Sequence, residues 1–340
     1  CYGVFPFDAQ GTPFGVIPNK CDSKVTNEAN DEQIVVWKVL PTRAMLGTFV
    51  RNAWYFVVGR NAGLVPYFLP GVLIAALCLL RVWEARLWHW LVFGVVAGEA
   101  WVLLALAPWT WNGDGGPPGN RYFLSIYPAM FFLLPASARW MSATAAALCG
   151  ALFTGAMTLS PFVSAKNTWV AVERAPLNWF PVELTIMNAL PVRLLDGTRA
   201  RINWHTDTYA QLYYLDENSY GVDRSADAEG LWLRGASRAE IVIKTDRPLT
   251  RIDFTATTPI ENRFAATMGR EHWAGPVGPG HEARFTFTPP PGVWSKGAWV
   301  YQVTFETEKG FFPRELESGS TDARYLGVFL RPRMIDETVK

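Results

Sequence analysis

The residues best suited to chemistry lie at Asn120 and Arg121, which follow the Gly- and Pro-rich loop NGDGGPPG and precede a long apolar run. A planar guanidinium matches phosphate oxygens, and glycines let backbone N–H groups approach an anion. Arg121, with Asn120 and the loop amides, could therefore bind a lipid-linked phosphate or pyrophosphate. Arg121 could equally be an interfacial anchor, with its stem in an apolar layer and its charge in water. The residues alone leave both interpretations open.

One carboxylate, Glu99, lies inside an apolar run, VVAGEAWVLL. A carboxylate is costly in a bilayer, so we expect Glu99 to face the interior of a helix bundle. There it would contribute a polar contact to a substrate cavity, or pair with a neighbouring helix. We do not assign it a catalytic role.

Other chemistry is sparse in the sequence. No Ser-His-Asp order and no His/Cys cluster with metal-ligand spacing stands out, so the catalytic residue is unknown and no metal site or cofactor is predicted. The net charge is +1 and no basic cluster is dense enough to track phosphates, which argues against a nucleic-acid partner. Cys1 and Cys21 could form a disulfide in an exported segment.

Uncharged or nearly uncharged stretches dominate the first half of the chain, and a bilayer core of about 30 Å requires helices of that kind. We predict an α-helical membrane region, residues 61–165, with about four transmembrane helices. Tryptophans gather near the ends of these runs, as in the aromatic belts of membrane interfaces. The predicted spans are 64–81, 87–108, 121–138 and 141–163.

Charge sets the expected orientation. Arg81 and Arg86 lie between the first two runs and Arg139 between the last two, so the positive-inside rule places these loops in the cytoplasm. The N-terminal segment, residues 1–60, and everything after 165 are then exported from a multi-pass protein. Residues 44–60 are apolar but interrupted by arginines, which favours an interfacial helix on the outer leaflet or a buried helix of the exported segment.

The second half of the chain has the pattern of an all-β domain. After a linker and short helix at 166–199, short alternating segments are separated by turn clusters such as GPVGPG and PPPG. This pattern predicts an exported antiparallel β-sandwich over 200–335. Its aromatic residues could stack on sugar rings, although most are expected in the core: Trp232, Trp273, Trp294, Trp299 and Tyr325.

Three segments resemble a known family. GRNAGLVPYFLPGVLIAAL at 59–77 and GDGGPPGNRYFLSIYPAMFFLLP at 113–135 resemble late membrane segments of bacterial multi-span glycosyltransferases of the GT-C superfamily, in the branch related to protein O-mannosyltransferases. The tail around Asp322 and Arg324 to Val328 is similar to a strand of C-terminal domains in some such proteins. Asn120 replaces a frequent proline, and Pro117–Pro118 replace a frequent aromatic-Ser pair.

The resemblance implies the C-terminal part of an integral membrane enzyme of the bacterial inner membrane. Such an enzyme moves sugar from a polyprenyl-phosphate donor to an acceptor on the outer face, and its catalytic acid lies in the first exported loop. We expect that acid outside this chain, which begins at Cys1 without a signal-peptide pattern and is expected to be a piece of a longer protein. Arg121, Asn120 and Tyr122 would contact the donor phosphate.

A non-enzymatic alternative also fits the sequence. A membrane-anchored envelope protein could display the β-sandwich to bind a glycan or a partner without catalysing any reaction. The expected partners are membrane lipid and a polyprenyl-phosphate sugar under the first hypothesis, and a glycan under either.

Overall fold

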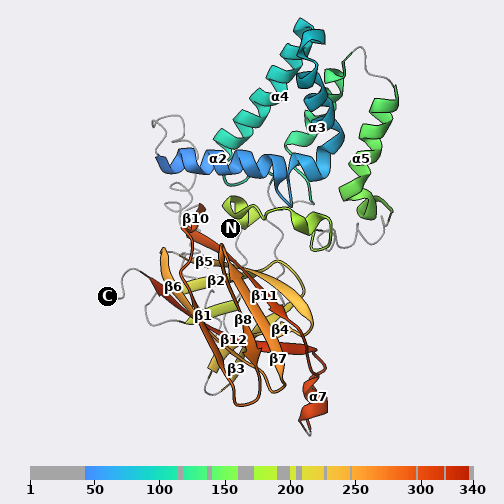
Figure 1. Ribbon diagram of the computed structural model, residues 1–340. Coiled ribbons are helices and arrows are strands. Elements are labelled where there is room, and N and C mark those ends of the chain that lie inside the picture. The colour runs from blue at the N-terminus through green and yellow to red at the C-terminus, as the bar shows by residue number, and fades with distance from the viewer. Residues whose placement is uncertain are drawn as a thin grey trace. The chain divides into compact units, whose positions relative to one another are not determined.

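The computed structural model describes residues 43–113, 118–135, 140–159, 172–189, 200–203, 209–225, 228–245, 247–295, 298–317 and 319–336. The chain divides into two compact units (Figure 1): a helical unit, with the described residues between 43 and 189, and a β unit, with those between 200 and 336. Cys1 and Cys21 lie outside the described residues, so their pairing stays a prediction.

The helical unit begins with α2, and Figure 1 shows α2 running crosswise to α3 and α4. Asn52, Tyr55 and Phe56 are buried on one side of α2, while Val50 and Trp54 are exposed on the other. The predicted helix at 44–60 therefore exists, and both of its faces are largely apolar. The elements of this unit are α2 (Arg43–Val58), α3 (Leu64–Leu80), η1 (Val82–Glu84), α4 (Leu87–Leu106), η2 (Phe123–Ser125), η3 (Tyr127–Leu133), α5 (Trp140–Leu159), η5 (Leu177–Trp179) and η6 (Leu184–Ala189).

Small residues let the helices approach closely. A Cβ built on Gly150 of α5 would lie 2.5 Å from Cγ of Pro70 in α3, and one on Gly71 would lie 2.7 Å from the Tyr127 ring. Neither distance is tolerable, so α5 and η3 could not pack against α3 in this way with larger residues there.

The four-span membrane prediction is not confirmed. Within the described residues one helix, Leu87–Leu106, is long and apolar enough to cross a bilayer, and α3 is a shorter apolar helix. Residues 121–135 do not form the single helix predicted over 121–138. They form the 3-10 segments η2 and η3, and Pro128, near the start of η3, supplies no N–H for a helical hydrogen bond across the junction between them.

The β unit is an antiparallel sandwich of two sheets (Figure 1), which confirms the all-β prediction. One sheet has the order β1-β2-β5-β11-β7-β8, with β10 paired to β11, and the other has the order β3-β4-β12-β6-β9. The strands are β1 (Ala200–Asn203), β2 (Tyr209–Tyr214), β3 (Ser219–Ser225), β4 (Ala228–Arg234), β5 (Ser237–Thr245), β6 (Leu249–Thr257), β7 (Asn262–Met268), β8 (Glu271–Val277), β9 (Ala283–Phe287), β10 (Val293–Ser295), β11 (Ala298–Thr307) and β12 (Leu326–Asp336), with one short helix, α7 (Pro313–Leu316).

Alternating side chains build the core between the two sheets. In β9 the residues alternate strictly between buried and exposed, and Phe285 and Phe287 face inward. Phe254 of β6 packs against both of them and against Phe305 of β11. Trp273 also joins this core, stacked on Phe285 with ring centroids 4.5 Å apart. The sandwich thus has an aromatic core that fixes the strand ends and the loops attached to them.

Candidate functional site

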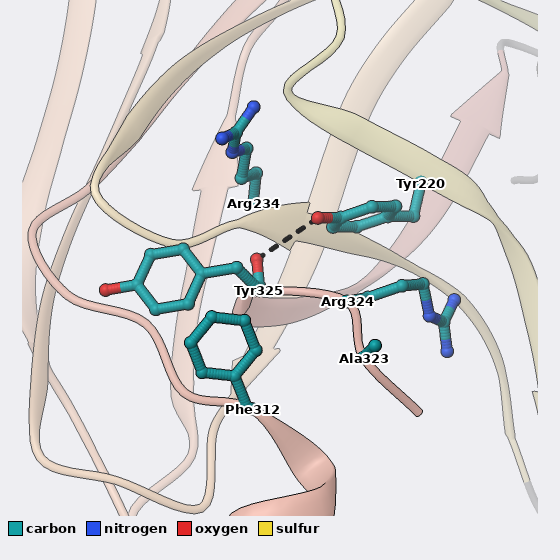
Figure 2. A pocket seen from close by; sticks show the side chains of 6 residues that line it. All are labelled: Tyr220, Arg234, Phe312, Ala323, Arg324 and Tyr325. Atoms are coloured by element: carbon teal, nitrogen blue, oxygen red, sulfur yellow. Dashed lines mark hydrogen bonds between the residues drawn. The ribbon is translucent and has the colours of Figure 1, made fainter. Parts of the chain in front are cut away.

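An open pocket of about 930 Å³ lies in the β unit where β3, β4 and the start of β12 meet (Figure 2). Two tyrosines, a phenylalanine and two arginines dominate its wall. The lining residues are Tyr220, Arg234, Phe312, Ala323, Arg324 and Tyr325. We refer to it below as the Tyr325 pocket.

Irregular strand pairing places Tyr220 at this pocket. The register of β3 on β4 shifts between Ser219 and Val222, on either side of Tyr220. The register of β12 on β4 shifts between Leu326 and Phe329, just after Tyr325. Such shifts bend a strand and redirect its side chains, and they are frequent beside functional sites. Here both occur at the same end of the sheet.

Two glycines leave room for the Tyr325 ring to lie close to the backbone. A Cβ on Gly235 would lie 2.9 Å from Cε1 of Tyr325, and a Cβ on Gly310 would lie 2.7 Å from its Cζ. The Tyr325 carbonyl accepts hydrogen bonds from the Gly235 N–H at 3.1 Å and from the Tyr220 hydroxyl at 3.3 Å. The aromatic ring therefore rests on bare backbone, and the same residue ties β3 to the β4 turn.

Phe312 extends the aromatic wall. It is the residue before α7, and its ring centroid lies 5.0 Å from that of Tyr325 at an angle of 43°. The Arg314 guanidinium lies over the Phe312 ring, 5.2 Å from its centroid. Cation–π contact of this kind keeps the ring in one orientation.

Arg324 is held by two carboxylates. Its Nε donates to Asp322 Oδ1 at 3.0 Å and its Nη2 to Asp322 Oδ2 at 2.6 Å, and Nη2 also lies 3.4 Å from Asp223 Oδ2. These hydrogen bonds lower the pKa of Asp322 and raise that of Arg324. The guanidinium lies over the Tyr220 ring, 5.5 Å from its centroid. The Asp322–Arg324 pair therefore presents hydrogen-bonding groups in a fixed plane beside the Tyr220 ring.

Arg234 differs from Arg324 in its surroundings. Within the described residues, its side chain makes no hydrogen bond or ion pair. Its backbone is fixed: the N–H donates to Asn218 O at 2.9 Å, and the carbonyl accepts from the Ser237 and Thr307 hydroxyls, both at 2.7 Å. Figure 2 shows Arg234 above and Phe312 below the Tyr325 ring, with the Arg324 side chain extending away from that ring, below Tyr220 in this view.

The Tyr325 pocket suits binding better than catalysis. Its lining residues offer aromatic faces for apolar ring surfaces and guanidinium groups for hydroxyls, and the carboxylates of Asp322 and Asp223 lie against Arg324. In the part of the chain that the structure describes, no group of three or more His, Cys, Asp or Glu side chains could hold a metal ion.

The three residues predicted to contact a donor phosphate are adjacent in the chain, but one is buried and two are exposed. Asn120 is buried, and its Oδ1 accepts the Phe123 N–H at 3.0 Å, while its Nδ2 has no hydrogen-bond partner. Arg121 and Tyr122 are exposed, and Arg121 Nη2 donates to the Gly113 carbonyl. Asn120 therefore fixes the backbone just before η2, whose N-cap is Tyr122, while Arg121 and Tyr122 are exposed.

Glu99 is partly buried on α4, and no described residue gives it a hydrogen bond or ion pair. Glu183, which lies in the segment predicted as a linker and short helix at 166–199, is a carboxylate surrounded by hydrogen-bond donors. Glu183 is fully buried and accepts the N–H groups of Asn61 at 2.7 Å and Ala62 at 2.8 Å, and Asn61 Nδ2 at 2.7 Å. Beside it, Arg60 donates to the carbonyls of Asn178 and Phe180. The sequence signal that could have identified Glu183 is that it is the one charged residue in the apolar stretch PVELTIM.

Most of the tryptophans named above as possible sugar-stacking residues pack inside the β unit instead. Trp273 and Trp299 pack against the sandwich core, and Trp232 packs on Phe311 and Phe329. Tyr325 alone of the flagged set lines the pocket. Tyr220 and Phe312, which complete the aromatic wall, were missed because only the fold brings them to Tyr325.

No family model and no curated protein matches the chain. Among solved structures, TmCBM61 in complex with beta-1,4-galactotriose is 9% identical over 38% of this chain and 88% of its own, with a TM-score of 0.23. A family 6 carbohydrate-binding module is 6% identical over 44% and 100%, with a TM-score of 0.21. The secreted serine protease VesC from Vibrio cholerae is 14% identical over 36% and 24%, with a TM-score of 0.22. These scores are too low to support an argument.

Proposed function

We propose that this protein is a membrane-anchored envelope protein whose exported β-sandwich binds a saccharide in the Tyr325 pocket. The observation that carries the proposal is the wall of that pocket, which combines partly exposed aromatic rings with a guanidinium held by carboxylates. Sugars have apolar C–H faces and a rim of hydroxyls, so they need both kinds of group at once.

The shape of the pocket favours the same class of ligand. It is open, and its aromatic rings are tilted against each other rather than closed around a cavity. A lipid chain or an apolar cofactor would gain little there, because most of its surface would stay in water. A saccharide suits an open pocket better, because its outward hydroxyls stay hydrated while its apolar face contacts the rings.

α4 supports the membrane anchor. With 20 residues and about 1.5 Å of rise per residue, it extends about 30 Å, the thickness of a bilayer core. Little of its apolar surface is covered by the rest of the protein. The positive-inside pattern of the flanking arginines supports an exported β unit.

The test is saccharide binding by the purified chain in detergent micelles. A glycan array identifies ligands, and calorimetry measures their affinity. We expect Tyr325→Ala to weaken binding about tenfold or more, as for an aromatic residue central to an interface. Tyr122→Ala removes an exposed tyrosine of the helical unit and should leave binding unchanged. Binding that survives Tyr325→Ala would rule out this pocket, and failure to bind any saccharide would rule out the function.

We further propose, as a second candidate, that the helical unit belongs to a GT-C-like glycosyltransferase and contacts a lipid-linked phosphate through Arg121. The observation in its favour is the exposure of Arg121 beside Gly113 and Gly119, which have φ values of +96° and +102°. Such backbone conformations are open to glycine and permit close approach by an anion.

Binding of a short-chain polyprenyl phosphate in micelles tests the second candidate. Arg121→Ala should abolish binding and Arg121→Lys should retain part of it, because lysine keeps the charge but not the planar fork. Arg51→Ala, at another exposed arginine, is the control. Equal binding by wild type and Arg121→Ala would leave Arg121 as an interfacial anchor.

A further inference from the structure

The two arginines of the Tyr325 pocket have different charge balances. Arg324 lies within hydrogen-bonding distance of both Asp322 and Asp223, so its charge is compensated inside the protein. Arg234 faces no carboxylate among the described residues. The wall that carries Arg234 is therefore positive, and the wall that carries Arg324 is neutral to negative.

Arg234 is also well prepared to bind an anion. Three hydrogen bonds fix its backbone at the end of β4, while its side chain is exposed. The exposed guanidinium is accessible to a ligand, and its two parallel N–H groups match two carboxylate oxygens. The fixed backbone also keeps this group at the edge of the aromatic wall.

We infer that the Tyr325 pocket selects acidic saccharides, with Arg234 pairing with the carboxylate of a uronic acid. This rests on the proposed saccharide function and adds the class of sugar. The ligand would lie with its ring on Tyr325 and Phe312 and its carboxylate at Arg234. Its hydroxyls would reach the Asp322–Arg324 pair, where an anionic group would instead meet the carboxylates of Asp322 and Asp223.

Matched ligands test the charge preference. The array carries uronic-acid oligosaccharides and their methyl esters, which differ in charge and little else. For the full chain in micelles we expect the free acids to bind about tenfold more tightly than the esters, with a preference that weakens as salt rises. Arg234→Gln should remove the preference while ester binding persists, and Arg234→Lys should keep part of it. Arg270→Gln, at an exposed arginine outside the pocket, should keep all of it.

The outcomes separate the two proposals. If acids and esters bind equally, or if Arg234→Gln retains the preference, the acidic class is wrong while saccharide binding through Tyr325 stands. If Tyr325→Ala leaves every affinity unchanged, the pocket itself is wrong and both proposals fall. If sulfated neutral sugars bind Arg234-dependently and uronic acids do not, the anion is a sulfate ester and the carboxylate assignment is overturned.

Discussion

Glu183 should be the most sensitive single position of the helical unit. Its carboxylate is fully buried and accepts three hydrogen bonds, from two backbone N–H groups and the Asn61 side chain. Those bonds fasten the turn between α2 and α3 to the segment before η6. Glu183→Ala would leave the N–H groups of Asn61 and Ala62 buried without acceptors, whereas Glu183→Gln keeps one oxygen that can accept both.

The size of the effect follows from those contacts. An unsatisfied buried backbone group costs about 1–3 kcal/mol, so two of them give about 3 kcal/mol once some water enters. For a unit of this size, about 3 kcal/mol corresponds to about 6–12 °C in melting temperature. Glu183→Gln should cost about 1 kcal/mol or less, because Asn61 can turn its amide oxygen toward the new N–H₂ group.

The pH dependence has a definite sign. Burial raises the pKa of Glu183 above its ordinary value of 4.5. A group with a raised pKa in the folded state contributes stability that is complete below pH 4.5 and is lost as pH rises through the folded-state pKa. The wild type should therefore lose stability over that interval, while Glu183→Gln, which does not titrate, should lack this part of the slope.

Thermal unfolding in detergent, followed by tryptophan fluorescence across a pH series, measures both effects. Hydrogen exchange at the Asn61 and Ala62 amides gives a local readout, since both should lose protection in Glu183→Ala and keep it in Glu183→Gln. If the two variants melt together, or if the alanine variant melts within a degree of the wild type, the hydrogen bonds to Glu183 do not stabilise this unit as argued.

Three further predictions concern the pocket and the topology. Gly310→Ala should displace the Tyr325 ring and weaken saccharide binding several-fold in calorimetry, while Gly221→Ala, whose Cβ meets nothing within 4 Å, should not. Because Arg324 lowers the pKa of Asp322 below 3.8, the Asp322–Arg324 pair persists above that pH and is lost as pH falls through the lowered pKa. Saccharide affinity should thus hold from pH 7 to pH 4, whereas Asp322→Asn should reduce it throughout. An alkaline phosphatase reporter fused after residue 165 should be active, and an inactive fusion would reverse the proposed orientation.

The β-sandwich could be predicted because its signal is local. Each strand such as 283–287 alternates buried and exposed residues, and turn clusters mark its ends. The helix predicted over 121–138 was wrong for an equally local reason. Hydropathy averages over a window and does not register that Pro128 removes a backbone donor, so an apolar run was mistaken for a continuous helix.

The candidate site could be predicted only in part. Tyr325 was flagged because it lies in a recognisable segment, but Tyr220 and Phe312 reach it only through β3–β4 pairing and the α7 turn. Glu183 was missed because its partners at Asn61 and Ala62 are distant in the sequence. Contacts between distant segments depend on register and packing, which one sequence does not display.

The contrast between Arg234 and Arg324 shows why residue type alone does not identify a binding group. Both arginines line the same pocket, yet Arg324 is engaged by Asp322 and Asp223 while Arg234 has no partner among the described residues. An anion approaching Arg324 would have to compete with two carboxylates, and their repulsion would offset the attraction of the guanidinium. An anion approaching Arg234 competes only with water. The pocket can therefore orient an acidic sugar by charge alone, with Arg234 fixing the carboxylate end and Arg324 left to bind hydroxyls.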